Sequence, residues 1–494
     1  MLSARLLTRR SVVIAIIVGT LVGALLIASR RLDEFCPAGD YCDALVGMRH
    51  KVPASNAENV SVVESNPHHQ EQERPLETPV AQPAADPSCE NFPDTSNVLL
   101  VMKTGASEAY SKVPTQVLTN LRCLPEYFIF SDMDQHVAGV HIHDSLDTVL
   151  PEVKNSSSDF KLYFRQQKCA ADQESCDKYA DTAAEGWALD KYKNIHIAEK
   201  AYNRRPDYDW YLFVDADTYV LWPTMVEWLK QFDPTDPHYL GSVAYLGNTP
   251  FGHGGSGYLV SQAAMHDFFH GKTNVANRWD SETTGECCGD LMFSVALKEE
   301  TGVGVNNTWP TINGEKPFTL AYGSSQWCQP ITTMHHIGSE EVSEFHAFEL
   351  SRNFSSPMRI KDIYHQFVEP RLKPFRADWD NMSDDWMYVS KELYIHLEEW
   401  QRDRVKQKQL SKTEEKAHLN SASCREACEN HDDCFQWKYE EQICSFAASF
   451  KHGRPAKPST KMAERALSGW NVNKIKAWVI EHDDCGEIVW PNLE

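Results

Sequence analysis

The sequence predicts an α/β fold with a largely parallel sheet, preceded by a membrane-spanning helix and followed by a small disulfide-rich module. Short apolar runs alternate with helical patterns through the middle of the chain, as expected for parallel strands joined by helices. An uncharged apolar stretch lies near the N-terminus, and cysteines crowd together near the C-terminus. Each of these observations predicts the structure of one part of the chain.

The predicted membrane helix spans residues 11–29, none of which is charged. A helix rising about 1.5 Å per residue would cover roughly 28 Å over this stretch, which suits a bilayer. A cleaved signal peptide is the alternative, but its apolar region is usually only roughly 7–15 residues long. No clear small-x-small cleavage site follows the stretch. We therefore expect a cytoplasmic tail at residues 1–10 and an uncleaved signal-anchor at residues 11–29.

Cysteines and glycosylation sequons predict that the rest of the chain is lumenal. All 14 cysteines lie beyond the predicted anchor, and their even number allows complete pairing in an oxidising compartment. Asn-x-Ser/Thr sequons, which mark acceptor sites in secreted proteins, lie there too. They begin at Asn59, Asn155, Asn306, Asn353 and Asn381. These features predict a single-pass type II protein with residues 30–494 in the lumen.

Residues 30–90 are predicted to form an extended stem. Prolines recur among Glu, Gln, Ser and Asn over residues 51–88, a composition that cannot bury enough apolar surface to fold. Cys36 and Cys42 either close a small loop or pair two chains, and the sequence leaves both open. A disulfide-linked or stem-mediated dimer is therefore one expectation.

The charge of the chain argues against nucleic acid as its main partner. The formal net charge is −22, and no Lys/Arg block is large enough to offset it locally. Binding a polyphosphate backbone requires a basic stripe that releases counterions. A nucleotide-sugar is compatible with this acidity, because one divalent metal can neutralise its few phosphates.

Residues 91–375 are predicted to form the α/β domain. Its first strands are the apolar runs 98–102 and 127–130, and a helical pattern over 186–202 precedes a buried strand at 210–214. Ligands bind beyond the carboxyl ends of the strands in such sheets. The candidate ligand-binding residues that follow the first two strands are Lys103, Thr104, Gly105 and Asp132.

Four Asp-x-Asp tripeptides occur in this acidic chain, so the tripeptide alone carries little weight. Only the tripeptide of Asp215 and Asp217 directly ends a strongly apolar strand. Two carboxylates at that position suit Mn²⁺ or Mg²⁺ bridged to a diphosphate. The alternative is that they cap a turn.

Glycines and histidines supply further candidates. The Gly-rich run 254–260, which includes Gly255, either lets the backbone approach a ligand closely or forms a plain turn before a helix at 261–269. His335 and His336 are either metal ligands or ordinary packed histidines.

Asp290 precedes a predicted helix at residues 291–298. It is either a first-turn acidic residue favoured by the helix dipole or a carboxylate that acts as a general base.

The order of these motifs resembles glycosyltransferase family 31. The strings that carry the resemblance are KTGASE (103–108), FSDMDQ (130–135), GWALDKYK (186–193) and YLFVDADTYV (211–220). It covers roughly residues 95–345, and within the family the chain looks most like fungal members similar to core 1 β-1,3-galactosyltransferase. The resemblance implies a GT-A fold and an inverting enzyme that uses Mn²⁺, or alternatively Mg²⁺, with a UDP-sugar.

The resemblance also implies roles for individual residues. Asp290 would be the catalytic base, and the nucleotide-sugar site would hold Lys103, Thr104, Gly105, Asp132, Asp215 and Gly255. The metal would be held by Asp215, Asp217 and either His335 or His336. Two positions depart from the family pattern: Ala216 stands where animal relatives have a middle aspartate, and Gly289 replaces the usual Glu before the catalytic Asp.

The implied activity is the transfer of galactose from a UDP-sugar to a glycan hydroxyl of a glycoprotein in a β-1,3 linkage, at the Golgi membrane. One alternative is a family 31 transferase with another donor, such as UDP-GlcNAc or UDP-Glc. The other is a catalytically inactive carbohydrate-binding protein.

The C-terminal region, residues 376–494, contains a cysteine cluster that resembles a PAN/apple module. The cluster consists of Cys424, Cys428, Cys434 and Cys444. Such modules bind proteins or carbohydrates. A zinc site is the alternative, but paired disulfides are favoured in an oxidising lumen.

Overall fold

The computed structural model describes residues 86–491 except 170, 356 and 462–464, and these residues belong to one compact unit. The predicted cytoplasmic tail, the signal-anchor at 11–29 and nearly all of the stem lie outside the described residues. Cys36, Cys42 and Asn59 lie outside them as well. No described helix combines the length and the apolar character that a membrane span requires.

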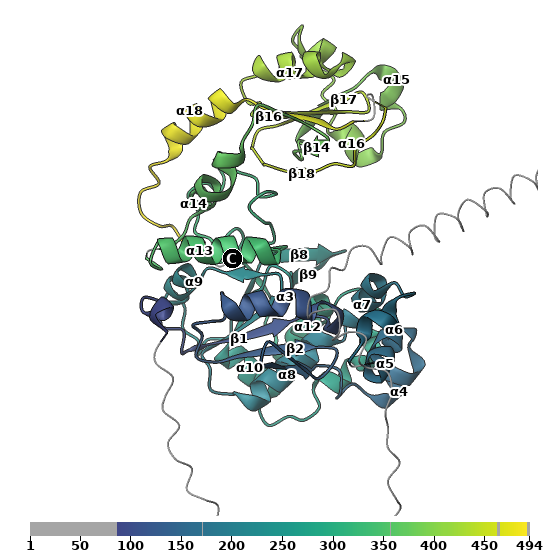
Figure 1. Cartoon of the computed structure of the whole chain (residues 1–494), viewed down its shortest axis with the longest axis vertical. Coiled ribbons are helices and arrows are strands. Elements are labelled where there is room, and N and C mark those ends of the chain that lie inside the picture. Colours follow the sequence, from purple (N-terminus) through teal and green to yellow (C-terminus); the bar gives the residue numbers. More distant parts are fainter. Residues whose placement is uncertain (1–85, 170, 356, 462–464, 492–494) are drawn as a thin grey trace, which may run out of the picture. The chain divides into compact units, whose positions relative to one another are not determined.

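An eight-stranded mixed sheet, rich in parallel pairs, forms the centre of the larger region (Figure 1). Its order is β11-β7-β10-β5-β1-β2-β4-β3. The strands are β1 (Val98–Lys103), β2 (Tyr127–Ser131), β3 (Gln135–Val137), β4 (Val140–Asp144), β5 (Trp210–Asp215), β7 (Tyr239–Gly241), β10 (Tyr258–Ser261) and β11 (Asn306–Asn307). Strands β5, β1, β2 and β4 run parallel, whereas β10 and β3 are antiparallel to their neighbours. The predicted α/β class with a largely parallel sheet is confirmed.

Helices cover both faces of this sheet. Successive strand residues point to opposite faces, so Val101 and Phe213 join one apolar cluster while Leu100 and Leu212 join the other. The first cluster is covered by α8 (Lys193–Arg204), α10 (Gln262–Phe269) and α12 (Gly289–Thr301), and the second by α3 (Ala106–Leu118) and α9 (Trp222–Leu229). Burial on both faces explains why these strands read as continuous apolar runs.

Shorter elements complete the larger region. Between β4 and β5 lie α4 (Pro151–Ser156), α5 (Lys161–Lys168), α6 (Gln173–Asp177) and α7 (Thr182–Asp190). Further elements are β6 (Tyr219–Val220), β8 (Val243–Leu246), β9 (Thr249–Gly252), α11 (Asp280–Thr283), β12 (Thr333–Met334), α13 (Ser339–Ser351) and α14 (Ile360–Ile363). The helical pattern predicted over 186–202 is in fact divided between α7 and α8, which meet at Lys191 and Tyr192.

The C-terminal region holds an antiparallel five-stranded sheet in the order β13-β19-β16-β17-β15. These strands are β13 (Phe375–Ala377), β15 (Trp386–Tyr388), β16 (Gln436–Glu440), β17 (Ile443–Ala447) and β19 (Leu467–Trp470). A strand pair, β14 (Trp379–Asp380) with β18 (Arg454–Pro455), and the helices α15 (Lys391–Tyr394), α16 (Glu399–Asp403), α17 (Ser421–Glu429) and α18 (Val472–His482) accompany it.

All twelve described cysteines form disulfides, as expected for an oxidising compartment. The pairs are Cys89–Cys123, Cys169–Cys176, Cys287–Cys288, Cys328–Cys485, Cys424–Cys444 and Cys428–Cys434. The last two pairs join α17 to β17 and to the turn before β16. The preference for disulfides over a zinc site in this cluster is confirmed.

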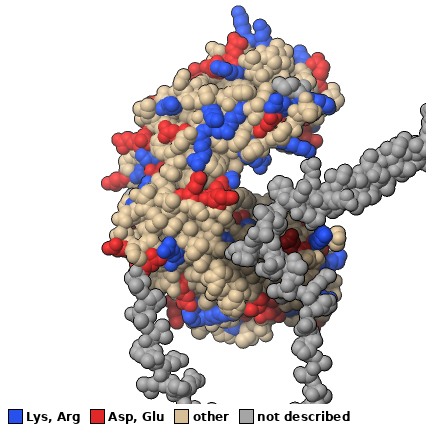
Figure 2. All heavy atoms as spheres, in the orientation of Figure 1, with Lys and Arg blue, Asp and Glu red and all other residues tan. Residues whose placement is uncertain are grey.

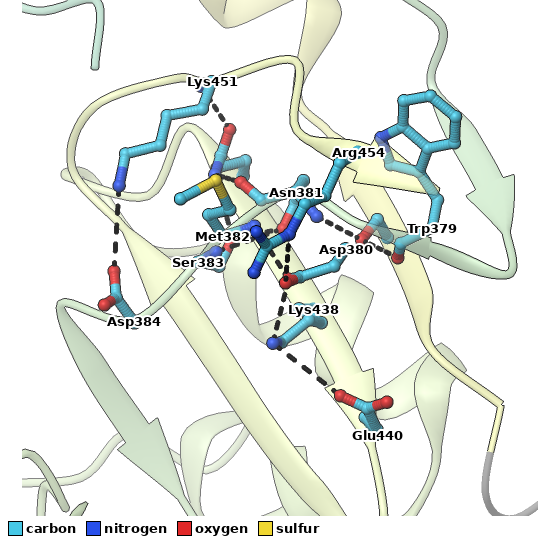
Figure 3. Close-up of polar contacts among 12 residues, drawn as sticks. Trp379, Asp380, Asn381, Met382, Ser383, Asp384, Lys438, Glu440, Lys451 and Arg454 are labelled. Carbon is cyan, nitrogen blue, oxygen red and sulfur yellow. Dashed lines mark hydrogen bonds and ion pairs between the residues drawn. The ribbon is translucent and has the colours of Figure 1, made fainter. Parts of the chain in front are cut away.

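One of the five sequons is unsuited to carry a glycan in the folded chain. Asn381 is fully buried, and its side-chain amide donates to the carbonyl oxygens of Trp437 and Gly469. Its side-chain oxygen accepts from the backbone N–H and the hydroxyl of Ser383, which lies beside it in Figure 3. The side-chain amide to which an oligosaccharide would be linked is therefore already used in hydrogen bonds that stabilise the loop before β15.

Charged side chains of both signs share the surface of the described region. Figure 2 shows acidic and basic residues interspersed over the visible face.

Candidate active site

The carboxyl ends of the parallel strands bring the sequence-predicted residues together. In the sheet register Lys103, the last residue of β1, lies opposite Asp215, the last residue of β5. Lys103 Nζ is 3.3 Å from Asp215 Oδ1 and 2.5 Å from Asp190 Oδ2. Burial opposes the charge of Lys103, but the two carboxylates outweigh it and raise the lysine's pKa. The lysine is thereby fixed as a cation at the sheet edge.

A second lysine extends this ion network to the turn after β2. Lys193 Nζ lies 3.4 Å from Asp190 Oδ1 and 3.3 Å from Asp132 Oδ1, and it donates to the carbonyl oxygen of Thr104 at 3.0 Å. Asp132 also accepts from the backbone N–H of Ala106, the first residue of α3, at 2.8 Å. Asp132 is 1% exposed. Through its bonds to Ala106 and Lys193, its buried carboxylate stabilises the Thr104–Gly105 turn.

Asp217 and two histidines form a cluster of metal-ligating type. Asp217, His335 and His336 each offer one ligand atom, and these atoms all lie within 4.8 Å of one another. Asp217 Oδ1 is 3.2 Å from His335 Nε2, and Asp217 Oδ2 is 3.3 Å from Lys112 Nζ. Burial would raise the pKa of Asp217, but His335 and Lys112 together lower it. Asp215 is directed to Lys103 and is not part of this three-residue group.

The two histidines differ in their surroundings. His335 is 7% exposed, and its Nδ1 has no hydrogen-bond partner among the described residues. A Cβ at position 255 would lie 2.2 Å from the His335 ring, so only Gly255 leaves room for that ring. His336 is exposed and has a positive φ of 58°. The close approach of Gly255 therefore fixes His335, the buried member of the pair.

Oxygen and nitrogen donors in this arrangement fit a divalent metal such as Mn²⁺. One carboxylate and two imidazoles would occupy part of its coordination sphere, leaving positions for phosphate oxygens. The buried Nδ1 of His335 has no hydrogen-bond partner among the described residues, and Lys112 places a positive charge beside the Asp217 carboxylate.

A cavity of about 430 Å³ opens in front of these groups. Its lining includes eight of the sequence-predicted residues, namely Lys103, Thr104, Gly105, Asp132, Asp215, Asp217, His335 and His336. Gly255 and Asp290 do not line it. The volume lies within the range of small-molecule sites, which is about 300–1,000 Å³.

Lys112, Trp187, Asp190 and Lys193 are among the cavity-wall residues that sequence reasoning missed. Three of them lie in the string at 186–193, which carried part of the family resemblance without any assigned role. Trp187 is 69% exposed, which is unusual for so large a ring beside a polar cavity. A signal in the sequence could have revealed these residues. It is the three-residue spacing of Trp187, Asp190 and Lys193 on α7 and the start of α8, which places them on one side of the predicted helix.

Asp290 has the contacts of a first-turn acidic residue and does not line the cavity, so its role as a general base stays a prediction. It lies in the first turn of α12, where Oδ1 accepts from the backbone of Leu291 at 2.9 Å. Oδ2 accepts from the backbone N–H of Gly254 at 2.7 Å, so the side chain also contacts the Gly-rich run. His253, the residue before Gly254, is partly buried, and burial lowers its pKa.

Tertiary packing explains one of the two departures from the family pattern. A Cβ at Gly289 would lie 2.5 Å from Asn194 Oδ1 and 2.9 Å from the Lys191 carbonyl oxygen, so α12 passes too close to α8 for a larger residue. Ala216 is 4% exposed and belongs to the apolar cluster around β5, but it also lines the cavity. Nothing in the structure explains the absence of an aspartate at position 216.

Comparison with known proteins identifies part of the chain. Residues 96–286 match a family model described as Fringe-like, and no curated protein matches the chain. The matched segment contains most of the cavity wall, whereas Asp290, His335 and His336 follow it. Residues 96–286 are therefore similar to Fringe-like domains.

Proposed function

We propose that the chain is a metal-dependent glycosyltransferase that moves a hexose from a UDP-sugar to a glycan hydroxyl with inversion at the anomeric carbon. One observation carries the proposal. The Asp217, His335 and His336 cluster and the Lys103 ion network face a single cavity at the carboxyl ends of parallel strands. The Fringe-like match over residues 96–286 supports the same class.

Asp217 and His335, with His336 beside them, would hold the metal. A bound divalent cation would supply neutralisation of the charge that develops on the diphosphate leaving group. Lys112 Nζ lies 3.3 Å from Asp217 Oδ2, and its partly buried side chain would supply a further positive charge near the diphosphate.

The rest of the cavity wall would hold the nucleotide. The exposed ring of Trp187 offers an apolar face on which the uracil base can stack. Lys103 and Lys193 are each neutralised by carboxylates, so we propose that they set the shape of the Thr104–Gly105 turn. Asp132 contributes in the same way, through its bonds to Ala106 and Lys193.

Asp290 would act as the general base. Its Oδ atoms would receive the proton of the acceptor hydroxyl as that oxygen attacks the anomeric carbon from the side opposite the leaving group. The Gly254 N–H, 2.7 Å from Oδ2, would orient the carboxylate without neutralising it.

The finer assignment follows the sequence resemblance. We propose galactose as the transferred hexose, a β-1,3 linkage of the core 1 O-glycan type and a glycoprotein acceptor. We propose that the chain acts as a type II protein of the Golgi membrane, anchored by residues 11–29. UDP-GlcNAc and UDP-Glc are the alternative donors, and a PAN/apple-like role in protein or carbohydrate binding is proposed for residues 376–494.

A donor screen tests the proposal. Full-length chain in detergent is incubated with Mn²⁺, a glycopeptide that carries N-acetylgalactosamine, and UDP-galactose, UDP-GlcNAc or UDP-Glc in turn. Acceptor-dependent release of UDP with one donor is expected, and Asp217→Ala should abolish it. Absence of both UDP release and Mn²⁺-dependent UDP binding would overturn the proposal in favour of a non-catalytic carbohydrate-binding protein.

A further inference from the structure

A second cluster of metal-ligating side chains lies outside the candidate active site, where the turn after β2 meets the β3–β4 hairpin. Asp134, His141 and His143 each offer one ligand atom, all within 4.8 Å of one another. Asp134 Oδ2 is 2.7 Å from His141 Nε2. The ring of His136 stacks on that of His141, with centroids 4.7 Å apart.

The backbone register places the imidazoles on one face. His136 on β3 lies directly opposite His141 on β4, and His143 follows two residues later on the same face. Ala138 and Gly139 form the hairpin turn with positive φ values of 52° and 79°, as a two-residue hairpin turn requires. A slip of one residue would send His141 and His143 to the other face.

The cluster is open to a hydrated ion from one side. The side chains of Asp134 and His141 are 64% and 40% exposed, whereas His143 is partly buried beside Phe130.

We propose that Asp134, His141 and His143 form a binding site for a divalent transition cation of the zinc class. Two imidazoles and one carboxylate, with water in the fourth position, match the ligand types and the four-coordination that Zn²⁺ prefers. Zinc–ligand distances of about 2.0–2.2 Å require the side chains to draw together, which exposed side chains achieve by rotation.

A metal here would stabilise a turn that also serves the cavity. Asp134 is two residues from Asp132, which bonds to the first turn of α3 and to Lys193. Binding of an ion would tie this turn to the β3–β4 hairpin. Because the ion would bind the folded chain, it should raise the melting temperature as its concentration rises above the dissociation constant.

Zinc titration of the full-length chain, without a polyhistidine tag and stripped of metal, tests the proposal. Isothermal titration calorimetry is done in the background Asp217→Ala/His335→Ala, which removes the other cluster. One Zn²⁺ per chain is expected in this background. Adding His141→Ala/His143→Ala should abolish that binding, while adding His396→Ala, an exposed histidine outside both clusters, should leave it unchanged.

Two results would overturn the site. The first is no zinc binding in the Asp217→Ala/His335→Ala background, and the second is unchanged binding after His141 and His143 are replaced. If that last variant does not fold, Asp134→Asn, which keeps the size of the side chain, replaces it in the same background. It should weaken zinc binding at least tenfold, and an unaltered affinity would reject the assignment. Co²⁺ absorption provides a second readout, because nitrogen ligation should appear only when His141 and His143 are present.

Discussion

The turns that follow β2 and β5 share an Asp-x-Asp tripeptide and a common local arrangement. In each, the first aspartate turns inward to a lysine: Asp132 Oδ1 lies 3.3 Å from Lys193 Nζ, and Asp215 Oδ1 lies 3.3 Å from Lys103 Nζ. In each, the second aspartate lies beside a histidine. The same tripeptide after two parallel strands therefore gives an inward ion pair, fully buried after β2 and partly buried after β5, and an outward carboxylate.

The two outward carboxylates differ in what surrounds them. The side chains of Asp217 and His335 are 22% and 8% exposed, and both line the 430 Å³ cavity. The side chains of Asp134 and His141 are 64% and 40% exposed, and they lie just before and within the β3–β4 hairpin at the edge of the sheet. Burial beside a cavity, and not the tripeptide, is what distinguishes a candidate catalytic metal site from a peripheral one.

Loss of the candidate base should have the largest effect on chemistry. Asp290→Asn keeps the size of the side chain and an acceptor for the Gly254 N–H but removes the basic oxygen. Turnover should fall by roughly 10²–10⁴, with UDP-sugar affinity within a few-fold, because positioned proton transfer contributes to the transition state alone. Steady-state kinetics with a separate binding titration measure both, and unchanged turnover would exclude Asp290 as the base.

A methyl group at position 255 should disturb the Asp217 cluster without touching the Asp134 cluster. In Gly255→Ala the new Cβ would lie 2.2 Å from the His335 ring, so the imidazole must move. We expect Mn²⁺ affinity to fall by roughly 10–100-fold, the cost typical of misplaced ligand geometry. Gly304→Ala is the matched control, because a Cβ there meets nothing within 4 Å. Equal Mn²⁺ affinity in both variants would mean that His335 does not bind the metal.

The turn at Asp217 is also supported by a buried carboxyl, which gives a pH-dependent stability. Tyr219 donates to Glu349 Oε2 at 2.6 Å, and burial raises the pKa of Glu349 from 4.5 to about 8. Between these values the folded chain binds more protons than the unfolded chain, so stability falls as pH rises.

Glu349→Gln should remove this pH dependence while keeping an acceptor for Tyr219. As the pH rises from 5 to 8, the unfolding free energy of the wild type should fall by about 2–4 kcal/mol more than that of the variant, since each pKa unit corresponds to about 1.4 kcal/mol. Denaturant unfolding of both proteins at both pH values measures this difference. Parallel profiles for the two proteins would show that Glu349 is already ionised in the folded chain.

Much of the fold and the site edge could be predicted from local sequence. The strands were predictable because they are buried on both faces and read as apolar runs, and Asp215 and Asp217 because they end such a run. Lys112 could not be predicted, since it reaches Asp217 from the middle of α3 only after the helix packs on the sheet. The need for Gly289 likewise depends on the close passage of α12 beside Asn194.

The prediction that most directly separates the two Asp-x-Asp turns is Mn²⁺-dependent UDP binding by a matched pair of variants, Asp217→Ala and Asp134→Ala. Asp217→Ala should lose the Mn²⁺-dependent part of UDP affinity, while the melting temperature of the metal-free protein stays nearly unchanged. Asp134→Ala should bind UDP with Mn²⁺ as the wild type does. Retention of Mn²⁺-dependent UDP binding by Asp217→Ala would contradict the assignment of the catalytic metal to Asp217 and His335.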